Sequence, residues 1–184
     1  MLLLIVAAVS VATSAAQDSE RVAISRAASF VREFYASGRQ AISSSLPTAA
    51  ELKTVPTFFS ARLQNKFVAA ANFQAEWIAR HPDQPSASGG PPVVYKPPFV
   101  DGDIFTGSPD GSSRFTVGST TLKPDGSWVV SIHSEPEEGM SPWSVLVRVV
   151  VENGHLAIDD VLYQSDSGSV EDSLDHLLSY RDTD

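Results

Sequence analysis

The chain has 184 residues, of which 22 are acidic and 13 are basic, and its formal net charge is −9. It contains no cysteine, which excludes a disulfide framework and a thiolate metal site. The acidic balance argues against a protein that binds nucleic acid or an anionic membrane, because such binding requires clustered lysine and arginine.

The N-terminal segment has the pattern of an export signal. Its first 16 residues are uncharged and almost all apolar or small. Ser14 and Ala16 supply the small residues that signal peptidase requires, so we predict a signal peptide over residues 1–16, cleaved before Gln17. A membrane anchor is the alternative, but a spanning helix needs roughly 20 apolar residues. We therefore expect a periplasmic or secreted protein with no stable membrane insertion after cleavage, in which residues 17–184 form a single α+β domain.

The first half of that domain shows helical periodicity. One apolar stripe predicts a helix that ends near Gly38, and a second predicts a helix that ends near Arg80. Thr48 and Glu51 have capping-box spacing, and Pro56 suits a first helical turn. The stripes consist of Ile24, Ala27, Val31, Phe34 and Tyr35, and of Phe59, Leu63, Phe67, Ala70 and Trp77. A proline-rich stretch over residues 81–98 follows, which we interpret as a surface loop rather than an interdomain linker.

The second half shows strand patterns joined by turn residues. Pro124-Asp125-Gly126 predicts one hairpin turn, and Asn153-Gly154 predicts a second one of two residues. The segment "SVEDSLDHLLSYR" predicts a last helix, capped by Ser169 with Asp172. Helices followed by a strand meander indicate an α+β fold, with N-terminal helices packed on one face of a strongly curved antiparallel sheet and a C-terminal helix.

Five stretches together resemble a family of bacterial envelope proteins known as domain of unknown function 3828. These are "FVREFY", "FFSARL", "KPPFVDGDIFTG", "NGHLAIDDVLY" and "SLDHLLSY", within residues 25–181. The resemblance implies a bacterial protein of the cell envelope with a nuclear transport factor 2-like (NTF2-like) cone, in which helices close over a curved sheet. It implies no catalytic residue, and a fold of this kind hosts both enzymes and binding proteins.

The Asn153-Gly154 turn also predicts the register of the last hairpin. If Glu152 pairs with His155, Asp159 lies opposite Arg148 and forms a cross-strand ion pair. Asp160 then lies opposite Val147 on the apolar face of the sheet, where an unpaired carboxylate is costly. Three explanations remain open for Asp160: a β-bulge that turns it outward, a buried hydrogen-bond donor, or a wet pocket.

Few other polar residues are candidates for a ligand site. Beside Asp160 we single out Tyr35 and Trp77, whose OH and NH groups need partners when buried, and His133, which lies at a pocket mouth or at a solvated strand end. The four histidines lack the spacing of metal ligands, and "DGDIFTGSPDGSS" fails the calcium-loop pattern, so we expect no metal site and no cofactor. Asp101 and Asp103 are interpreted as turn caps.

These patterns favour an exported, non-enzymatic binding or interaction domain whose ligand is an unknown small molecule or protein. One version is an immunity-type inhibitor of a periplasmic toxin. The alternative is a cone-fold hydrolase or isomerase that uses Asp160 as a general acid/base, assisted by Tyr35 or His133. The enzyme hypothesis requires Asp160 to face a cavity, with a raised pKa and a polar side chain nearby.

Overall fold

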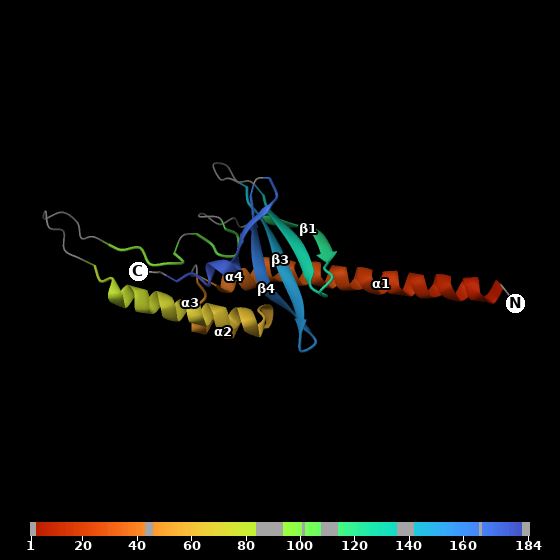
Figure 1. Cartoon of the computed structure of the whole chain (residues 1–184), viewed down its shortest axis with the longest axis horizontal. Helices are drawn as coiled ribbons and strands as arrows, with labels where there is room; N and C mark the ends of the chain where they lie inside the picture. The colour runs from red at the N-terminus through yellow and green to blue at the C-terminus, as the bar shows by residue number, and fades with distance from the viewer. Residues whose placement is uncertain are drawn as a thin grey trace.

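The computed structural model describes residues 3–42, 46–83, 94–100, 102–107, 114–135, 142–165 and 167–181, with the backbone alone for residues 3–16. It contains N-terminal helices and a five-stranded antiparallel sheet, which confirms the α+β class. The start of the first helix extends away from the rest of the molecule (Figure 1). In the described part of the chain, we find no helix long and apolar enough to cross a membrane.

The first predicted helix is present but runs past its predicted end. Helix α1 (Leu3–Glu33) continues without a break into a π-helical turn, η1 (Phe34–Gly38), and a 3₁₀ turn, η2 (Arg39–Ala41). Gly38 therefore does not stop the helix. It allows close packing instead, since an added Cβ would lie 2.8 Å from the Phe58 ring.

The second helical region divides into three pieces. They are α2 (Ala49–Thr54), the 3₁₀ turn η3 (Pro56–Phe58) and α3 (Ala61–Arg80). Both hydrogen bonds of the predicted capping box between Thr48 and Glu51 are present. Pro56 is the first residue of η3 and not of α3. Helix α3 begins later, after Ser60, whose hydroxyl caps it by accepting a hydrogen bond from the Leu63 amide.

The sheet is a simple meander in the order β1-β2-β3-β4-β5. Its strands are β1 (Phe115–Leu122), β2 (Trp128–Ser134), β3 (Ser144–Glu152), β4 (His155–Gln164) and β5 (Val170–Ser173). Both predicted hairpin turns are confirmed, and Asn153 and Gly154 adopt φ of 51° and 81°, the left-handed values that their turn requires. The sheet is not strongly curled, so the curvature expected of a cone is not confirmed.

The prediction of a last helix is wrong for residues 170–173. Residues 170–173 form β5, and only α4 (Leu174–Leu177) is helical. The cap is Ser173, whose hydroxyl accepts the His176 amide at 3.1 Å, and not Ser169. A turn in which the Ser165 amide donates to the Ser169 carbonyl at 2.9 Å folds the chain back onto β4, and strand pairing overrides the helical pattern.

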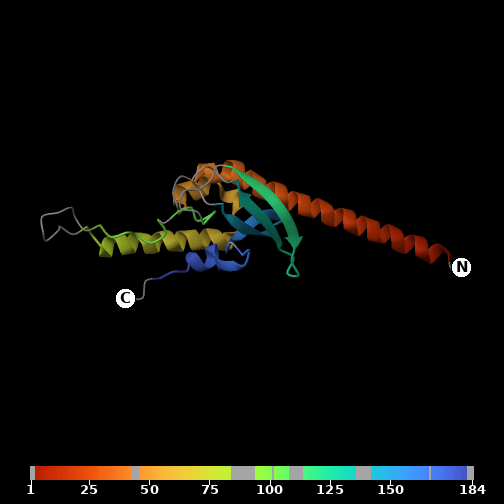
Figure 2. The same ribbon diagram turned by 90° about the horizontal axis from the view of Figure 1, so that it is seen from above.

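The core lies between the helices and the sheet. Helix α1 packs on β1 and β2, whereas α3 and α4 pack on β4 (Figure 2). At its centre the ring of Phe59 contacts those of Phe34, Phe67 and Phe105, with centroids 5.3 Å, 5.3 Å and 5.7 Å away. Such aromatic pairs add to the free energy gained by burial.

Candidate functional site

A β-bulge separates the two neighbouring aspartates. Arg148 lies opposite Asp160, and Val149 lies opposite Ile158, so Asp159 is an extra residue on β4. The predicted ion pair between Asp159 and Arg148 is therefore wrong, and an Arg148 guanidinium nitrogen instead lies 2.9 Å from an Asp125 carboxylate oxygen. The predicted position of Asp160 opposite Val147 is wrong for the same reason, because an inserted residue shifts every later pair.

Asp159 joins β4 to the start of α3. One of its carboxylate oxygens accepts hydrogen bonds from the Ser60 hydroxyl at 2.7 Å and from Arg62 Nε at 3.0 Å, and the other accepts from Arg62 Nη2 at 3.0 Å. Arg62 also pairs with Asp175 in the first turn of α4. Burial raises the pKa of Asp159, but the hydrogen bonds from Arg62 and Ser60 outweigh it, and the pKa lies below its ordinary value.

Asp160 is held by the backbone. Its Oδ1 accepts hydrogen bonds from the amides of Val161 and Asp175, each at 2.9 Å, so it fastens α4 to the sheet. The β-bulge is present but does not turn Asp160 outward, because its residue is only 8% exposed; the buried hydrogen-bond donors are the explanation that the structure shows. Burial raises the pKa of Asp160 more than these two amides lower it. Asp160 lines none of the pockets described below.

The other three candidates have separate surroundings. The buried Tyr35 hydroxyl donates to the Phe105 carbonyl oxygen at 2.7 Å, and its pKa is raised chiefly by burial. Trp77 stacks on His81, with ring centroids 4.1 Å apart, and lines a cavity of about 350 Å³ beside the end of α4. His133 is exposed at the end of β2, with Nδ1 2.8 Å from the Ser144 hydroxyl. None of these cavities is lined by two of the four candidates.

The predicted turn cap at Asp103 is confirmed, while Asp101 lies outside the described residues. One Asp103 oxygen accepts the Phe105 amide at 2.8 Å, and the other lies 2.8 Å from an Arg39 guanidinium nitrogen. Within the ranges that the structure describes, no three histidine, aspartate or glutamate side chains are grouped so as to hold a metal ion.

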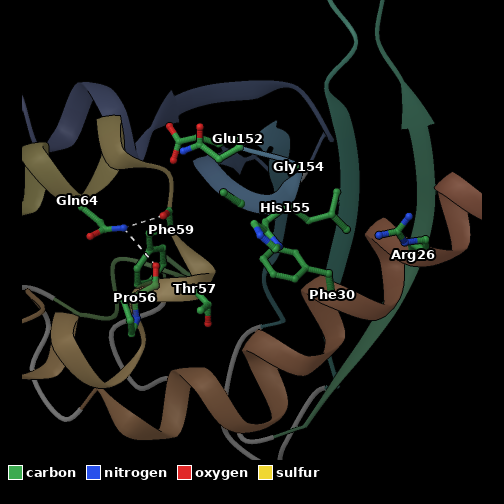
Figure 3. Close-up of a pocket in the computed structure, with 12 residues that line it drawn as sticks. Arg26, Phe30, Pro56, Thr57, Phe59, Gln64, Glu152, Gly154 and His155 are labelled. Carbon is green, nitrogen blue, oxygen red and sulfur yellow. Dashed lines mark hydrogen bonds between the residues drawn. The ribbon is translucent and has the colours of Figure 1, made fainter.

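The largest pocket that we describe lies under the β3–β4 hairpin and was not predicted. It has a volume of about 480 Å³ and lies between α1, η3, the start of α3 and the hairpin tip (Figure 3). We call it the hairpin groove. Its lining residues are Arg26, Phe30, Pro56, Thr57, Phe59, Gln64 and Glu152–Ala157. Its volume is in the range of small-molecule sites, and its lining combines apolar surface with a few polar groups.

The polar groups of the hairpin groove differ in whether they have protein partners. Glu152 accepts the Ala61 amide at 2.9 Å at the start of α3. Gln64 Nε2 donates to the carbonyl oxygens of Pro56 at 3.2 Å and Phe59 at 2.8 Å, as Figure 3 shows. Arg26 is exposed, and it makes no side-chain hydrogen bond or ion pair with any residue in the described ranges. The groove therefore presents one cation that is available to a ligand.

A smaller pocket of about 190 Å³ continues the groove beyond Arg26. It shares Arg26, Gly154 and Leu156 with the hairpin groove and adds Trp128 from β2. The Trp128 indole Nε1 is buried and finds no hydrogen-bond acceptor among the described residues. Leaving a buried donor unsatisfied costs about 1–3 kcal/mol.

Sequence reasoning missed the groove because its residues are far apart in the chain. Arg26 lies off the apolar stripe of α1, where a charged residue is ordinarily solvated. The available signal was Phe30, four residues after Arg26 on the same helix face and also off the predicted stripe. Comparisons of the chain with protein-family models, with curated proteins and with solved structures found no match.

Proposed function

We propose that the protein is an exported, non-enzymatic binding domain of the periplasm or the cell exterior, and that the hairpin groove is its ligand site. The observation that carries the proposal is a groove of about 480 Å³ with an apolar lining and an exposed Arg26 that has no ion-pair partner among the described residues. Export is supported by the uncharged, apolar first 16 residues. The absence of a recognisable catalytic motif in the sequence supports a binding role.

The contacts of Asp160 support binding over catalysis. The alternative function, a hydrolase or isomerase with Asp160 as general acid/base, is favoured by the raised pKa of Asp160. The hydrogen-bond partners of this carboxyl group are two backbone amides, however, and a structural cap needs nothing more. We therefore assign Asp160 a structural role.

The proposal also includes a fold family and a type of partner. We relate the fold to the NTF2-like architecture and the envelope family, on the basis of the N-terminal helices packed against an antiparallel sheet and the five matching stretches. An immunity-type inhibitor of a periplasmic toxin is one version of the binding function. It is supported by export and by the acidic net charge of −9, which suits a basic partner.

The test compares two tryptophan substitutions. Thr57 is exposed and lines the hairpin groove, whereas Thr54 is exposed and lies outside its lining. We expect native mass spectrometry of the protein purified from the periplasm to show a bound molecule or stoichiometric partner in the wild type and in Thr54→Trp, and to show neither in Thr57→Trp. The mass of the exported chain should correspond to a start at Gln17. Equal occupancy in the two variants, or no bound species in any of the three proteins, would contradict the proposal.

A further inference from the structure

We propose that the ligand of the hairpin groove is an organic acid, whose apolar body lies on the aromatic floor and whose carboxylate pairs with Arg26. This inference rests on the proposed function and names the ligand class. It follows from three features of the site: the polarity of the groove floor, the distribution of the charges, and the tryptophan that lies beside Arg26.

The floor of the groove is apolar. Phe30 and Phe59 contribute aromatic surface, and Leu156 and Ala157 contribute aliphatic surface from β4. Leu156 and Phe30 are only partly buried, so apolar surface remains to be covered. A ligand that removes this surface from water gains free energy in proportion to the area buried.

The charges of the groove are separated. Arg26 projects from α1 on one side, and Glu152 lies on the other side near the start of α3 (Figure 3). Glu152 already accepts the Ala61 amide and faces the positive end of the α3 helix dipole. Arg26 has no such counterpart in the part of the chain that the structure describes, so the charge that a ligand can compensate is positive. A guanidinium binds a carboxylate through two parallel hydrogen bonds, which an alcohol or an amine cannot reproduce.

The smaller pocket places a tryptophan beside Arg26. Trp128 lines this pocket together with Arg26, and its indole Nε1 is buried without an acceptor among the described residues. Both side chains line the same pocket, which opens into the groove at Arg26 and Leu156. A carboxylate bound at Arg26 therefore lies close to Trp128, whose fluorescence should change when the ligand binds.

The test uses octanoate, octanol and octylamine, which share one apolar chain and differ in the head group. We expect isothermal titration calorimetry on the wild type to show octanoate binding at least about tenfold more tightly than either of the others, the difference that a charge-assisted pair supplies. Octanoate should also change the tryptophan fluorescence, and Trp128→Phe should remove that change.

Arginine substitutions on α1 supply the matched controls. Arg26→Gln should weaken octanoate binding about tenfold or more, and Arg26→Lys should weaken it less, because lysine keeps the charge and loses the paired geometry. Arg21 lies on the same helix, is exposed and lines neither pocket, so Arg21→Gln should leave binding unchanged.

Each other outcome overturns the inference in a recognisable way. If octanol binds as tightly as octanoate, or if Arg26→Gln leaves octanoate binding unchanged, the carboxylate assignment is wrong. In that case, loss of all binding in Thr57→Trp would keep the groove as the site. If octanoate does not bind while a native ligand remains sensitive to Thr57→Trp, the ligand class is wrong and the proposed function stands.

Discussion

Neighbouring substitutions at the β4 bulge should have different effects on stability. Asp159→Asn removes the carboxylate charge that pairs with the Arg62 guanidinium, and leaves the hydrogen bond from Arg62 Nη2 to the Asp159 carbonyl oxygen in place. Asp160→Asn keeps an oxygen that can accept the amides of Val161 and Asp175, and removes a charge that burial disfavours. We therefore expect the first substitution to destabilise the protein and the second to be neutral or slightly stabilising at pH 7.

The magnitude for Asp159→Asn follows from the exposure of the pair. The Asp159 side chain is 12% exposed and the Arg62 side chain 44% exposed. Breaking a buried pair costs about 3–5 kcal/mol, and a fully exposed pair contributes about 0.2–1 kcal/mol. Since solvent screens Arg62 and asparagine can still accept the Ser60 hydroxyl, we expect a loss of about 1–2 kcal/mol. For a domain of this size the loss lowers Tm by about 3–6 °C.

The assay is urea unfolding at pH 7, followed by circular dichroism, with thermal unfolding as a second measurement. A double-mutant cycle with Arg62→Gln isolates the pair, and the coupling energy should account for most of the loss in Asp159→Asn. The reasoning is refuted if Asp160→Asn costs as much as Asp159→Asn, or if the cycle shows no coupling between Arg62 and Asp159.

Three further predictions concern single residues of the sheet and the core. Folding lowers the pKa of Asp159, so the Asp159 carboxylate contributes to the free energy of unfolding above its unfolded pKa of about 3.9. This contribution is lost as the pH falls through the folded pKa. The difference in free energy of unfolding between wild type and Asp159→Asn, measured by urea unfolding, should therefore shrink below about pH 4. Tyr35→Phe should cost about 1–3 kcal/mol in the same assay, because it leaves a core carbonyl unsatisfied, whereas Tyr180→Phe, at an exposed site, should cost less than about 0.5 kcal/mol; equal losses would disprove this role of Tyr35. Gly118→Ala would place a Cβ 2.4 Å from the Ser131 hydroxyl and should cost about 1–3 kcal/mol, and adding Ser131→Ala should recover part of the loss; no recovery would point to backbone strain instead.

The sequence was sufficient to predict the caps and turns that depend only on neighbouring residues. The Thr48 capping box and the Asn153-Gly154 turn depend on residues within one turn of chain, and both are confirmed. The bulge could not be predicted in this way. It places Asp159 against Ser60 and Arg62, which are 99 and 97 residues away, and no local pattern encodes that contact.

The same distinction explains the remaining differences. The last segment has a helical apolar pattern, but pairing with β4 stabilises residues 170–173 as a strand. The hairpin groove combines a helix face, a 3₁₀ turn and a hairpin tip, so it exists only in the folded chain. Among the four predicted ligand-site residues, Trp77 lines a described pocket, whereas Asp160 and Tyr35 bond to the backbone and His133 contacts Ser144.

Locating a bound ligand on the protein would decide whether the hairpin groove is the ligand site. In a two-dimensional ¹H–¹⁵N NMR titration with octanoate, we expect the largest shifts at the Arg26 side chain, the Trp128 indole and the Gly154 amide, and much smaller shifts around the cavity beside Trp77. Shifts concentrated at the Trp77 cavity, or no saturable shift at Arg26 and Trp128, would contradict the assignment of the hairpin groove as the ligand site.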